Sequence, residues 1–261
     1  MPGGLGVVLD SFGQPMKEAI ESAARLGFRR IELPAASGPV EPSELGRTGR
    51  RHLLRLVRGL GLELSALGGD LGGNRFMDGS RVEERLDRTR AIVELAAELR
   101  VPIVTTHLGR LDERAVERGL LAEVTQQLAD LADRTGTFVA LETGGADPAT
   151  LAGLLGRVNA PALGVCYDPA SLLIEGFEPL AGIEPLASSI LIARARDAVA
   201  GSPRHAGREV ALGAGQLDLP EYLAALDQAG YRNVPFIRRT ESEHPLADLA
   251  EAKRRLESVI R

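Results

Sequence analysis

The sequence predicts a single closed (β/α)₈ barrel domain that spans residues 1–261. Three observations support this fold class: the length, the eightfold alternation of strands and helices, and the absence of a linker. The length of 261 residues matches one such barrel, which commonly needs about 250 residues. Short runs rich in Val, Ile and Leu alternate eight times with amphipathic helical stretches, and no linker separates them. An open doubly wound α/β sheet shows the same alternation and is the competing prediction.

Each predicted strand is a mostly apolar run of about five to seven residues. Such near-continuous apolar runs are typical of parallel strands that are buried on both faces. Glycines in the segments LGF, GLGLEL and AGY mark repeated joints between a helix and the next strand. The predicted strands are residues 5–10, 29–33, 62–67, 102–107, 137–142, 162–168, 189–195 and 235–239.

Apolar residues at helical spacing predict amphipathic helices between these strands. The clearest stripes lie in residues 16–26, 82–99 and 246–260, and Gly27 closes the first of them. Two longer connections, residues 35–45 and 68–80, either shape a site at the barrel mouth or are plain surface loops. The second is rich in glycine, but it lacks the GxxxxGK[ST] order that cradles nucleotide phosphates.

Composition excludes several classes of function. The formal charge of −5 argues against a nucleic-acid partner, which requires a strongly basic face. Cys166 is the one cysteine, so the chain forms no internal disulfide and no thiolate cluster. The sequence shows neither a signal peptide nor an apolar run of about 18 residues. We therefore expect a cytoplasmic protein with no membrane partner.

Charged or imidazole side chains occur at the ends of most predicted strands. A charge at the end of an apolar strand is costly unless it is paired or binds a ligand. Active sites of these barrels lie at the carboxyl ends of the strands. The convergence of such residues therefore predicts a site at the mouth. The residues are Asp10, Glu32, His107, Glu142, Asp168, Arg194, Arg196, Arg238 and Arg239.

Four stretches carry a family resemblance: AARLGFRRIEL, LETGG, LGVCYDPASLLIEG and REVALGAGQLDLPEYLAALDQAGY. Through them the chain, from Glu21 to its end, resembles the xylose-isomerase-like TIM barrels, which include sugar and sugar-phosphate isomerases and epimerases. The resemblance implies a divalent metal held by Glu, Asp, His and Glu from strands five to eight. It implies that the two glutamates move a proton next to a carbonyl, and that the chain forms homo-oligomers.

Two of those four ligand positions are changed in this chain. Glu142 and Asp168 match the first glutamate and the aspartate, whereas the histidine falls on Arg194 and the second glutamate on Arg238. A guanidinium stays protonated and has no lone pair for a metal. We therefore expect no cofactor. We expect the two arginines to replace the charge of the metal and to pair with Glu142 and Asp168 in forked geometry.

A shifted metal site is the alternative. His107, Glu142 and Asp168 end three successive strands, and neighbouring strands lie about 4.8 Å apart. Such a site would hold Mn, Mg, Co or Zn with open positions for substrate. Otherwise His107 is a neutral imidazole hydrogen-bonded to Glu142. We also expect Asp197 to order the loop after the seventh strand.

Three functions remain open from the sequence. The first is an isomerase, epimerase or lyase without the usual metal, in which Glu142 abstracts a proton and Arg194 or Arg238 stabilises the oxyanion. The second is a metal-dependent isomerase with the shifted site, and the third is a non-catalytic carbohydrate-binding barrel. The ligand is a small carbohydrate or sugar acid in each. The catalytic set is Glu142, Asp168, Arg194 and Arg238, and the substrate-binding set is His107, Glu32, Arg196 and Asp10. Glu32 either reaches substrate hydroxyls or pairs with an arginine.

Overall fold

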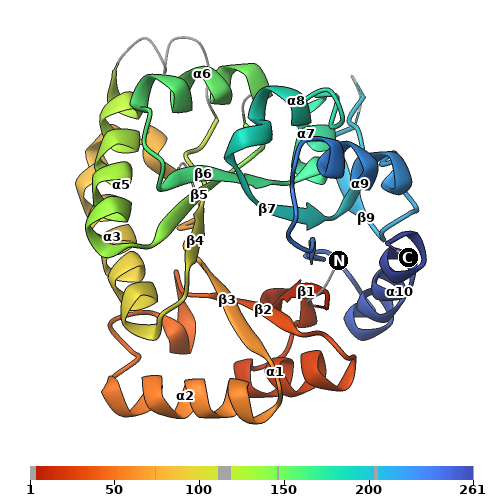
Figure 1. Ribbon diagram of the computed structural model, residues 1–261, viewed down its shortest axis with the longest axis horizontal. Helices are drawn as coiled ribbons and strands as arrows, with labels where there is room; N and C mark the ends of the chain where they lie inside the picture. Colours follow the sequence, from red (N-terminus) through yellow and green to blue (C-terminus); the bar gives the residue numbers. More distant parts are fainter. Residues whose placement is uncertain (1–3, 74, 111–118, 146, 203–204, 261) are drawn as a thin grey trace.

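A computed structural model shows a closed barrel of eight parallel strands surrounded by helices (Figure 1). The structure describes residues 4–73, 75–110, 119–145, 147–202 and 205–260. All eight predicted strands are confirmed, most of them shorter by a few residues. Closure of β10 onto β1 excludes the open sheet. In order around the barrel, the strands are β1 (Gly6–Val8), β2 (Arg30–Pro34), β3 (Glu63–Gly68), β4 (Ile103–Thr106), β5 (Phe138–Glu142), β6 (Leu163–Tyr167), β7 (Ile190–Ala195) and β10 (Phe236–Ile237).

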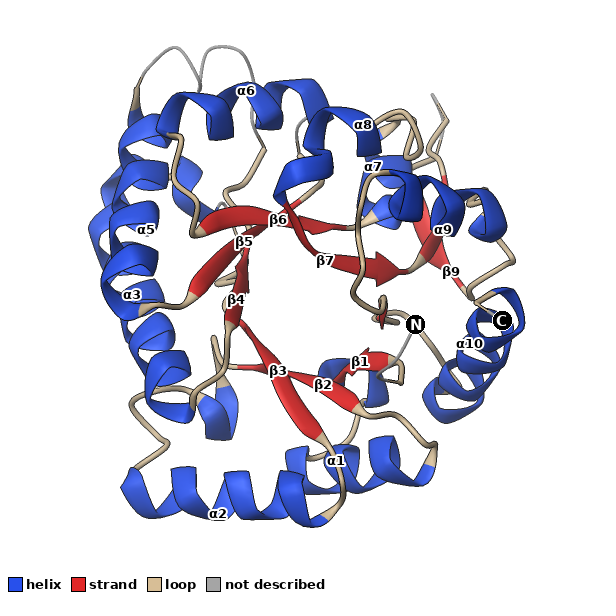
Figure 2. Cartoon of the chain, viewed as in Figure 1, coloured by secondary structure: helices blue, strands red, loops and turns tan. Residues whose placement is uncertain are grey.

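The helices form an outer ring around the strands (Figure 2). Each helix packs its apolar stripe against the strands. In α3, for example, buried residues recur at helical spacing from Val82 to Leu99. No helix in the described ranges is long and apolar enough to cross a membrane. The helices are α1 (Met16–Arg25), α2 (Arg47–Gly59), α3 (Val82–Leu99), α5 (Leu120–Thr135), α6 (Pro148–Val158), α7 (Pro169–Glu175), α8 (Ile183–Leu186), α9 (Leu219–Gln228) and α10 (Pro245–Val259).

Short elements fill the connections at the strand ends. The loop after β2 contains the 3₁₀ helix η2 (Gly38–Val40), and the loop after β3 contains η3 (Arg75–Met77) and η4 (Gly79–Arg81). The 3₁₀ helix η1 (Leu9–Phe12) follows β1 directly, and η5 (Ala187–Ser189) precedes β7. An antiparallel hairpin of β8 (Asp197–Val199) and β9 (Arg208–Val210) follows β7. The sequence did not predict this hairpin, because each of its strands has three residues.

Two apolar clusters stabilise the barrel. The larger one packs the helices against the outer faces of the strands. The smaller one fills part of the barrel interior and consists of Val8, Ala66, Ala140, Cys166, Ile192 and Phe236. Residues in register on neighbouring strands point to the same face of a sheet. Glu32 is in register with Val8, and Arg194 with Phe236, so both charged side chains point into the barrel interior.

Candidate functional site

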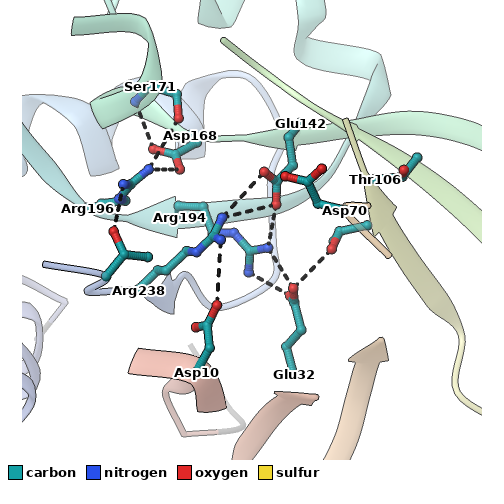
Figure 3. Close-up of polar contacts among 12 residues, drawn as sticks. Asp10, Glu32, Asp70, Thr106, Glu142, Asp168, Ser171, Arg194, Arg196 and Arg238 are labelled. Carbon is teal, nitrogen blue, oxygen red and sulfur yellow. Dashed lines mark hydrogen bonds and ion pairs between the residues drawn. The ribbon is translucent and has the colours of Figure 1, made fainter. Parts of the chain in front are cut away.

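Arg194 of β7 is a fully buried cation between two carboxylates (Figure 3). Its Nη1 donates to Glu32 Oε2 at 2.6 Å and its Nη2 to Glu32 Oε1 at 2.8 Å, which is a forked pair. Nη2 also donates to Glu142 Oε1 at 3.2 Å. Thr105 Oγ1 donates a further bond of 3.0 Å to Glu32. With 0% of its side chain exposed, Arg194 holds Glu32 and Glu142 in position below the mouth and does not face a ligand.

Of the two roles predicted for Glu32, contact with substrate hydroxyls or pairing with an arginine, the structure shows the pairing. Glu32 lies on β2, is 2% exposed and is paired with Arg194 across the barrel. A buried ion pair is tolerated when its hydrogen bonds are satisfied, as they are here for both oxygens of Glu32. The carboxylate is thus engaged inside the barrel and does not reach out to substrate hydroxyls.

Glu142 lies at the end of β5 between two guanidinium groups. Besides Arg194, Arg238 Nη1 lies 3.4 Å from both Oε1 and Oε2 of Glu142. Burial raises the pKa of Glu142, but Arg238 and Arg194 outweigh it and hold the pKa below the ordinary value of a glutamate. The side chain is 7% exposed. Glu142 is therefore an ionised, doubly paired carboxylate and a weak proton acceptor.

Arg238 extends this cluster to the rim of the barrel. Its Nη2 lies 3.6 Å from Asp10 Oδ2, which joins the groups in the order Glu32, Arg194, Glu142, Arg238 and Asp10. The side chains of Glu32 and Arg194 are buried, and exposure increases from Arg194 through Glu142 to Arg238 and Asp10, which are 19% and 38% exposed. The outer end of the cluster is therefore the part that a ligand can contact.

Asp168 corrects one prediction. We expected it to pair with Arg194 or Arg238, but its Oδ2 accepts a bond of 3.0 Å from Arg196 Nη1. Its Oδ1 caps α7 by accepting from the N–H groups of Ala170 and Ser171. Arg194 turns into the interior toward β2 and β5. Arg196, two residues along, is the arginine that meets β6.

Glu209 of β9 is a buried residue of this region that the sequence analysis missed. Its Oε2 accepts from Arg196 Nη2 at 2.8 Å, and its Oε1 lies 3.3 Å from Arg239 Nη1. Its Oε1 also accepts from the backbone N–H of Thr240. Glu209 thus links the hairpin to the ends of β7 and β10. The available signal was an acidic residue directly before the apolar residues 210–212.

His107 and Asp197 give one correction and one confirmation. His107 Nδ1 accepts a bond of 2.9 Å from the N–H of Gly109, and no bond joins it to Glu142 in the described structure. Burial and the nearby Arg75 lower the pKa of His107, which is therefore neutral. Asp197 accepts from the N–H groups of Gly213, Gly215 and Leu217, so it orders the segment after the hairpin as expected.

The residues present do not fit the divalent metal that the fold family implies. Among the described residues, no group of three or more His, Cys, Asp and Glu side chains is arranged to hold a metal ion. Glu142 is engaged by two guanidinium groups and Asp168 by Arg196 and a helix cap. A further cation beside Arg194 would be repelled by about 4 kcal/mol per unit-charge pair at 4 Å and an effective dielectric of 20.

Unpartnered donors remain at the mouth. The Nε atoms of Arg194, Arg196 and Arg238 are buried and have no hydrogen-bond partner within the described ranges. Buried N–H groups in proteins are normally satisfied by protein, water or ligand. The arginines of β7 and β10 therefore offer more donors than the surrounding carboxylates use. At the partly exposed Arg238 this surplus suits a ligand that is rich in oxygen.

The fold and this mouth define a (β/α)₈ barrel with a site at the carboxyl ends of its strands. The chain matches the family described as xylose isomerase-like TIM barrel over residues 20–259 and belongs to that family. No significant match was found among curated proteins.

Solved structures confirm the fold. A xylose isomerase domain protein from Planctomyces limnophilus has a TM-score of 0.87 and 23% identity, covering 98% of this chain and 96% of that one. D-Psicose 3-epimerase from Clostridium cellulolyticum H10, solved with D-tagatose, has a TM-score of 0.78 and 16% identity over 99% of both chains. A probable 3-DHS dehydratase from Bacillus anthracis has a TM-score of 0.75 and 17% identity, covering 97% of this chain and 98% of that one.

Proposed function

We propose that this chain binds a small sugar or sugar acid at the barrel mouth and catalyses isomerase-type proton transfer without the divalent metal of its family. One observation carries the proposal: the guanidinium groups of Arg194 and Arg238 flank Glu142 at 3.2 and 3.4 Å. They supply fixed positive charge beside the carboxylate that the family uses as a ligand. The partly exposed guanidinium of Arg238 would stabilise a developing oxyanion as a metal ion would, while the buried Arg194 holds Glu142 in place.

Arg238 is the arginine that would meet the ligand. It is partly exposed, and its Nε has no partner in the described structure. A guanidinium binds carboxylates in forked geometry. The ligand class favoured by this site is therefore a sugar acid over a neutral sugar. D-Psicose 3-epimerase, which has the same fold, was solved with the sugar D-tagatose, and this is consistent with a small carbohydrate-type ligand.

A non-catalytic binding barrel is the second candidate. It is favoured by the double pairing of Glu142, which leaves that carboxylate without the freedom of a general base. This candidate shares the ligand class and differs in the absence of turnover. Deuterium exchange, described below, separates the two.

Calorimetric titration tests the proposed ligand class. D-Glucuronate should bind the purified chain more tightly than D-glucose, and the affinity should be the same with EDTA as with added Mn²⁺. Arg238→Gln should weaken glucuronate binding about tenfold or more, since it removes one charge-assisted hydrogen bond. Equal affinity for both sugars, or binding that requires metal, would contradict the proposal.

Restoring the two family ligands tests the charge replacement. The double substitution Arg194→His and Arg238→Glu should create a site for Mn²⁺ or Co²⁺, because it returns a neutral imidazole and a carboxylate beside Glu142 and Asp168. Metal content of the dialysed protein, measured by elemental analysis, is the readout. The matched control is Arg239→Glu, which changes the same charge one residue away and should bind no metal. A metal-free double variant would contradict our assignment of these two positions.

A further inference from the structure

We propose that Asp10, and not Glu142, is the carboxylate that accepts and returns the proton, while Arg238 holds the oxygen of the same ligand. This inference rests on the proposed function and deepens it. It assigns proton transfer to a residue at the end of β1, on the opposite side of Arg238 from Glu142 (Figure 3).

The backbone places Asp10 at the rim. The strand β1 ends at Val8, and the chain turns at once into η1, which is closed by Gly13 at φ 60°. Ser11 Oγ accepts a bond of 3.0 Å from the N–H of Arg239, the residue after Arg238. This bond fixes the loop after β1 to the loop after β10. The same hydroxyl donates a long bond of 3.4 Å to Asp10 Oδ1, so Ser11 helps to hold the Asp10 carboxylate beside Arg238.

Asp10 and Glu142 are bound in opposite ways. Glu142 has two guanidinium partners and is 7% exposed. Protonation of Glu142 would therefore cost its ion pairs with both Arg194 and Arg238. Asp10 has one cationic partner, at 3.6 Å, and is 38% exposed. The carboxylate that can change its charge at low cost is therefore Asp10.

The charged groups that face Asp10 strengthen this difference. Partial burial of the Asp10 carboxyl group in the mouth and the negative charges of Glu32 and Glu142 raise the pKa of Asp10, while Arg238 and Arg194 lower it. The balance leaves the pKa of Asp10 above the ordinary value of an aspartate. Arg238 and Arg194 instead lower the pKa of Glu142. A base whose pKa is nearer to neutral pH is the more effective one.

The other described carboxylates of this region are not equivalent. Asp70, on the loop after β3, is forked to Arg75 at 3.1 and 3.0 Å, and its pKa is lowered, with hydrogen bonding and the charge of Arg75 outweighing burial. Asp168 is fully buried and caps a helix. Neither has an open oxygen beside Arg238. Asp10 is thus the mouth carboxylate that can contact the same ligand as the partly exposed guanidinium of Arg238.

The proposed step needs no co-reactant. Asp10 takes the proton from the carbon next to an aldehyde carbonyl, and the C–H electron pair forms the carbon–carbon double bond of an enediolate. The carbonyl oxygen takes up the negative charge and is held by Arg238. The second hydroxyl proton moves to this oxygen, and Asp10 returns its proton to the former carbonyl carbon. The aldehyde becomes a ketone, and Asp10 regains its charge.

A single carboxylate adds the proton to the face from which it removed one. Inversion at a carbon requires proton donation from the opposite face, and the described mouth offers no second open carboxylate beside Arg238. The substrate class is therefore a hydroxy-aldehyde with a carboxylate, such as a uronate. The reaction class is aldehyde–ketone isomerisation and not epimerisation.

Solvent exchange tests the role of Asp10. The whole chain is incubated with D-glucuronate in D₂O, and deuterium incorporation into the sugar and its ketone product is followed by NMR. Asp10→Asn should lower the rate constant about 100-fold or more with little change in the KM, because general base catalysis is lost while Arg238 is kept. Glu142→Gln should lower the rate constant much less than Asp10→Asn does, because it loosens the hold on Arg238 but leaves the proposed base in place. Asp70→Asn is the matched control, since it removes an equal charge from the same mouth, and it should retain exchange.

The pH dependence supplies a second readout. The exchange rate of the unmodified chain should rise with pH as Asp10 loses its proton and should level off above the raised pKa of Asp10. Titration of ¹³C-labelled aspartates and glutamates by NMR should place Asp10 above Glu142 whether or not glucuronate reacts. This measurement also covers the case in which Glu142→Gln does not fold.

Each result has one meaning. Exchange retained by Asp10→Asn but lost by Glu142→Gln, or a Glu142 pKa above that of Asp10, overturns the role of Asp10 and leaves the proposed function standing. Glucuronate binding without exchange by the unmodified chain supports the non-catalytic barrel and overturns both proposals. Epimerised glucuronate as the product overturns the single-face argument.

Discussion

The arginine at position 194 changes what the surrounding carboxylates can do. Glu32 and Glu142 both point into the barrel, where an ionised carboxylate without a partner is very costly. In this chain the guanidinium of Arg194 offsets that cost by pairing with both carboxylates. Besides the forked pair with Glu32, Nη2 of Arg194 donates to Glu142, so one side chain connects β2, β5 and β7.

Arg194→Met should therefore be strongly destabilising. It leaves Glu32 without its forked partner and Glu142 with Arg238 alone, and breaking a buried ion pair costs about 3–5 kcal/mol. The free energy of unfolding, measured by urea denaturation at pH 7, is the readout. Arg254→Met on α10 is the control, because that side chain is 72% exposed and its pairing is worth little. Equal losses in the two variants would contradict the role of Arg194.

The arginines of α2 show how charge is arranged at the scale of one element. This helix carries Arg47, Arg51, Arg55 and Arg58 on its exposed surface and has no acidic residue. Helix α10, in contrast, pairs Arg255 with Glu251 and Lys253 with Glu257. Like charges four residues apart destabilise a helix, and cations are unfavourable near its first turn. Burial of the apolar inner face of α2 therefore offsets the repulsion among the arginines on its outer face.

Arg51→Glu should raise stability. It replaces two repulsive i,i+4 contacts, with Arg47 and Arg55, by attractive ones and adds a negative charge near the start of α2. The gain should be about 0.5–1 kcal/mol at low salt and should shrink as salt screens the charges. Thermal unfolding at two salt concentrations measures it. The reciprocal control is Arg255→Glu, which places a like charge beside Glu251 and should lower stability.

Closure of the barrel is decided at the scale of the whole molecule. The seam between the first and last strands has two register pairs, Gly6 with Phe236 and Val7 with Ile237. Gly6 has no side chain where the ring of Phe236 crosses it, and a Cβ at this position would lie 2.7 Å from that ring. The two ends of the chain thus meet through a close backbone-to-ring contact. The same seam brings Asp10 and Arg238 together just beyond it.

Gly6→Ala should weaken this closure. The added methyl group forces Phe236 to move within the packed interior, and overpacking of this kind costs about 1–3 kcal/mol. Faster amide hydrogen exchange in β1 and β10 than in β5 and β6 should accompany the loss. Gly153→Ala in α6 is the matched control, because a Cβ there meets nothing within 4 Å. That variant should gain about 0.5–1 kcal/mol from helix propensity.

Most of the fold was predictable because its signals are local. Each strand between Gly6 and Ile237 is a short apolar run, and a run of that kind reports burial on both faces wherever it occurs. That Arg194 and Arg238 stand at two metal-ligand positions of the family stays a prediction. That neither guanidinium can bind a metal was readable, since this property of an arginine side chain does not depend on its neighbours. The hairpin Asp197–Val210 was missed because its strands are too short to show a period.

By itself, the sequence determined the fold class, the eight barrel strands and the fixed positive charge at positions 194 and 238. Tertiary structure alone decided that Asp168 pairs with Arg196, that His107 bonds to Gly109, and that Glu142 is enclosed while Asp10 is open. The physical reason is distance along the chain. Asp10 and Arg238 are neighbours because the barrel closes, and their exposure depends on how deep each side chain lies in it. Residue type and spacing carry no measure of that depth.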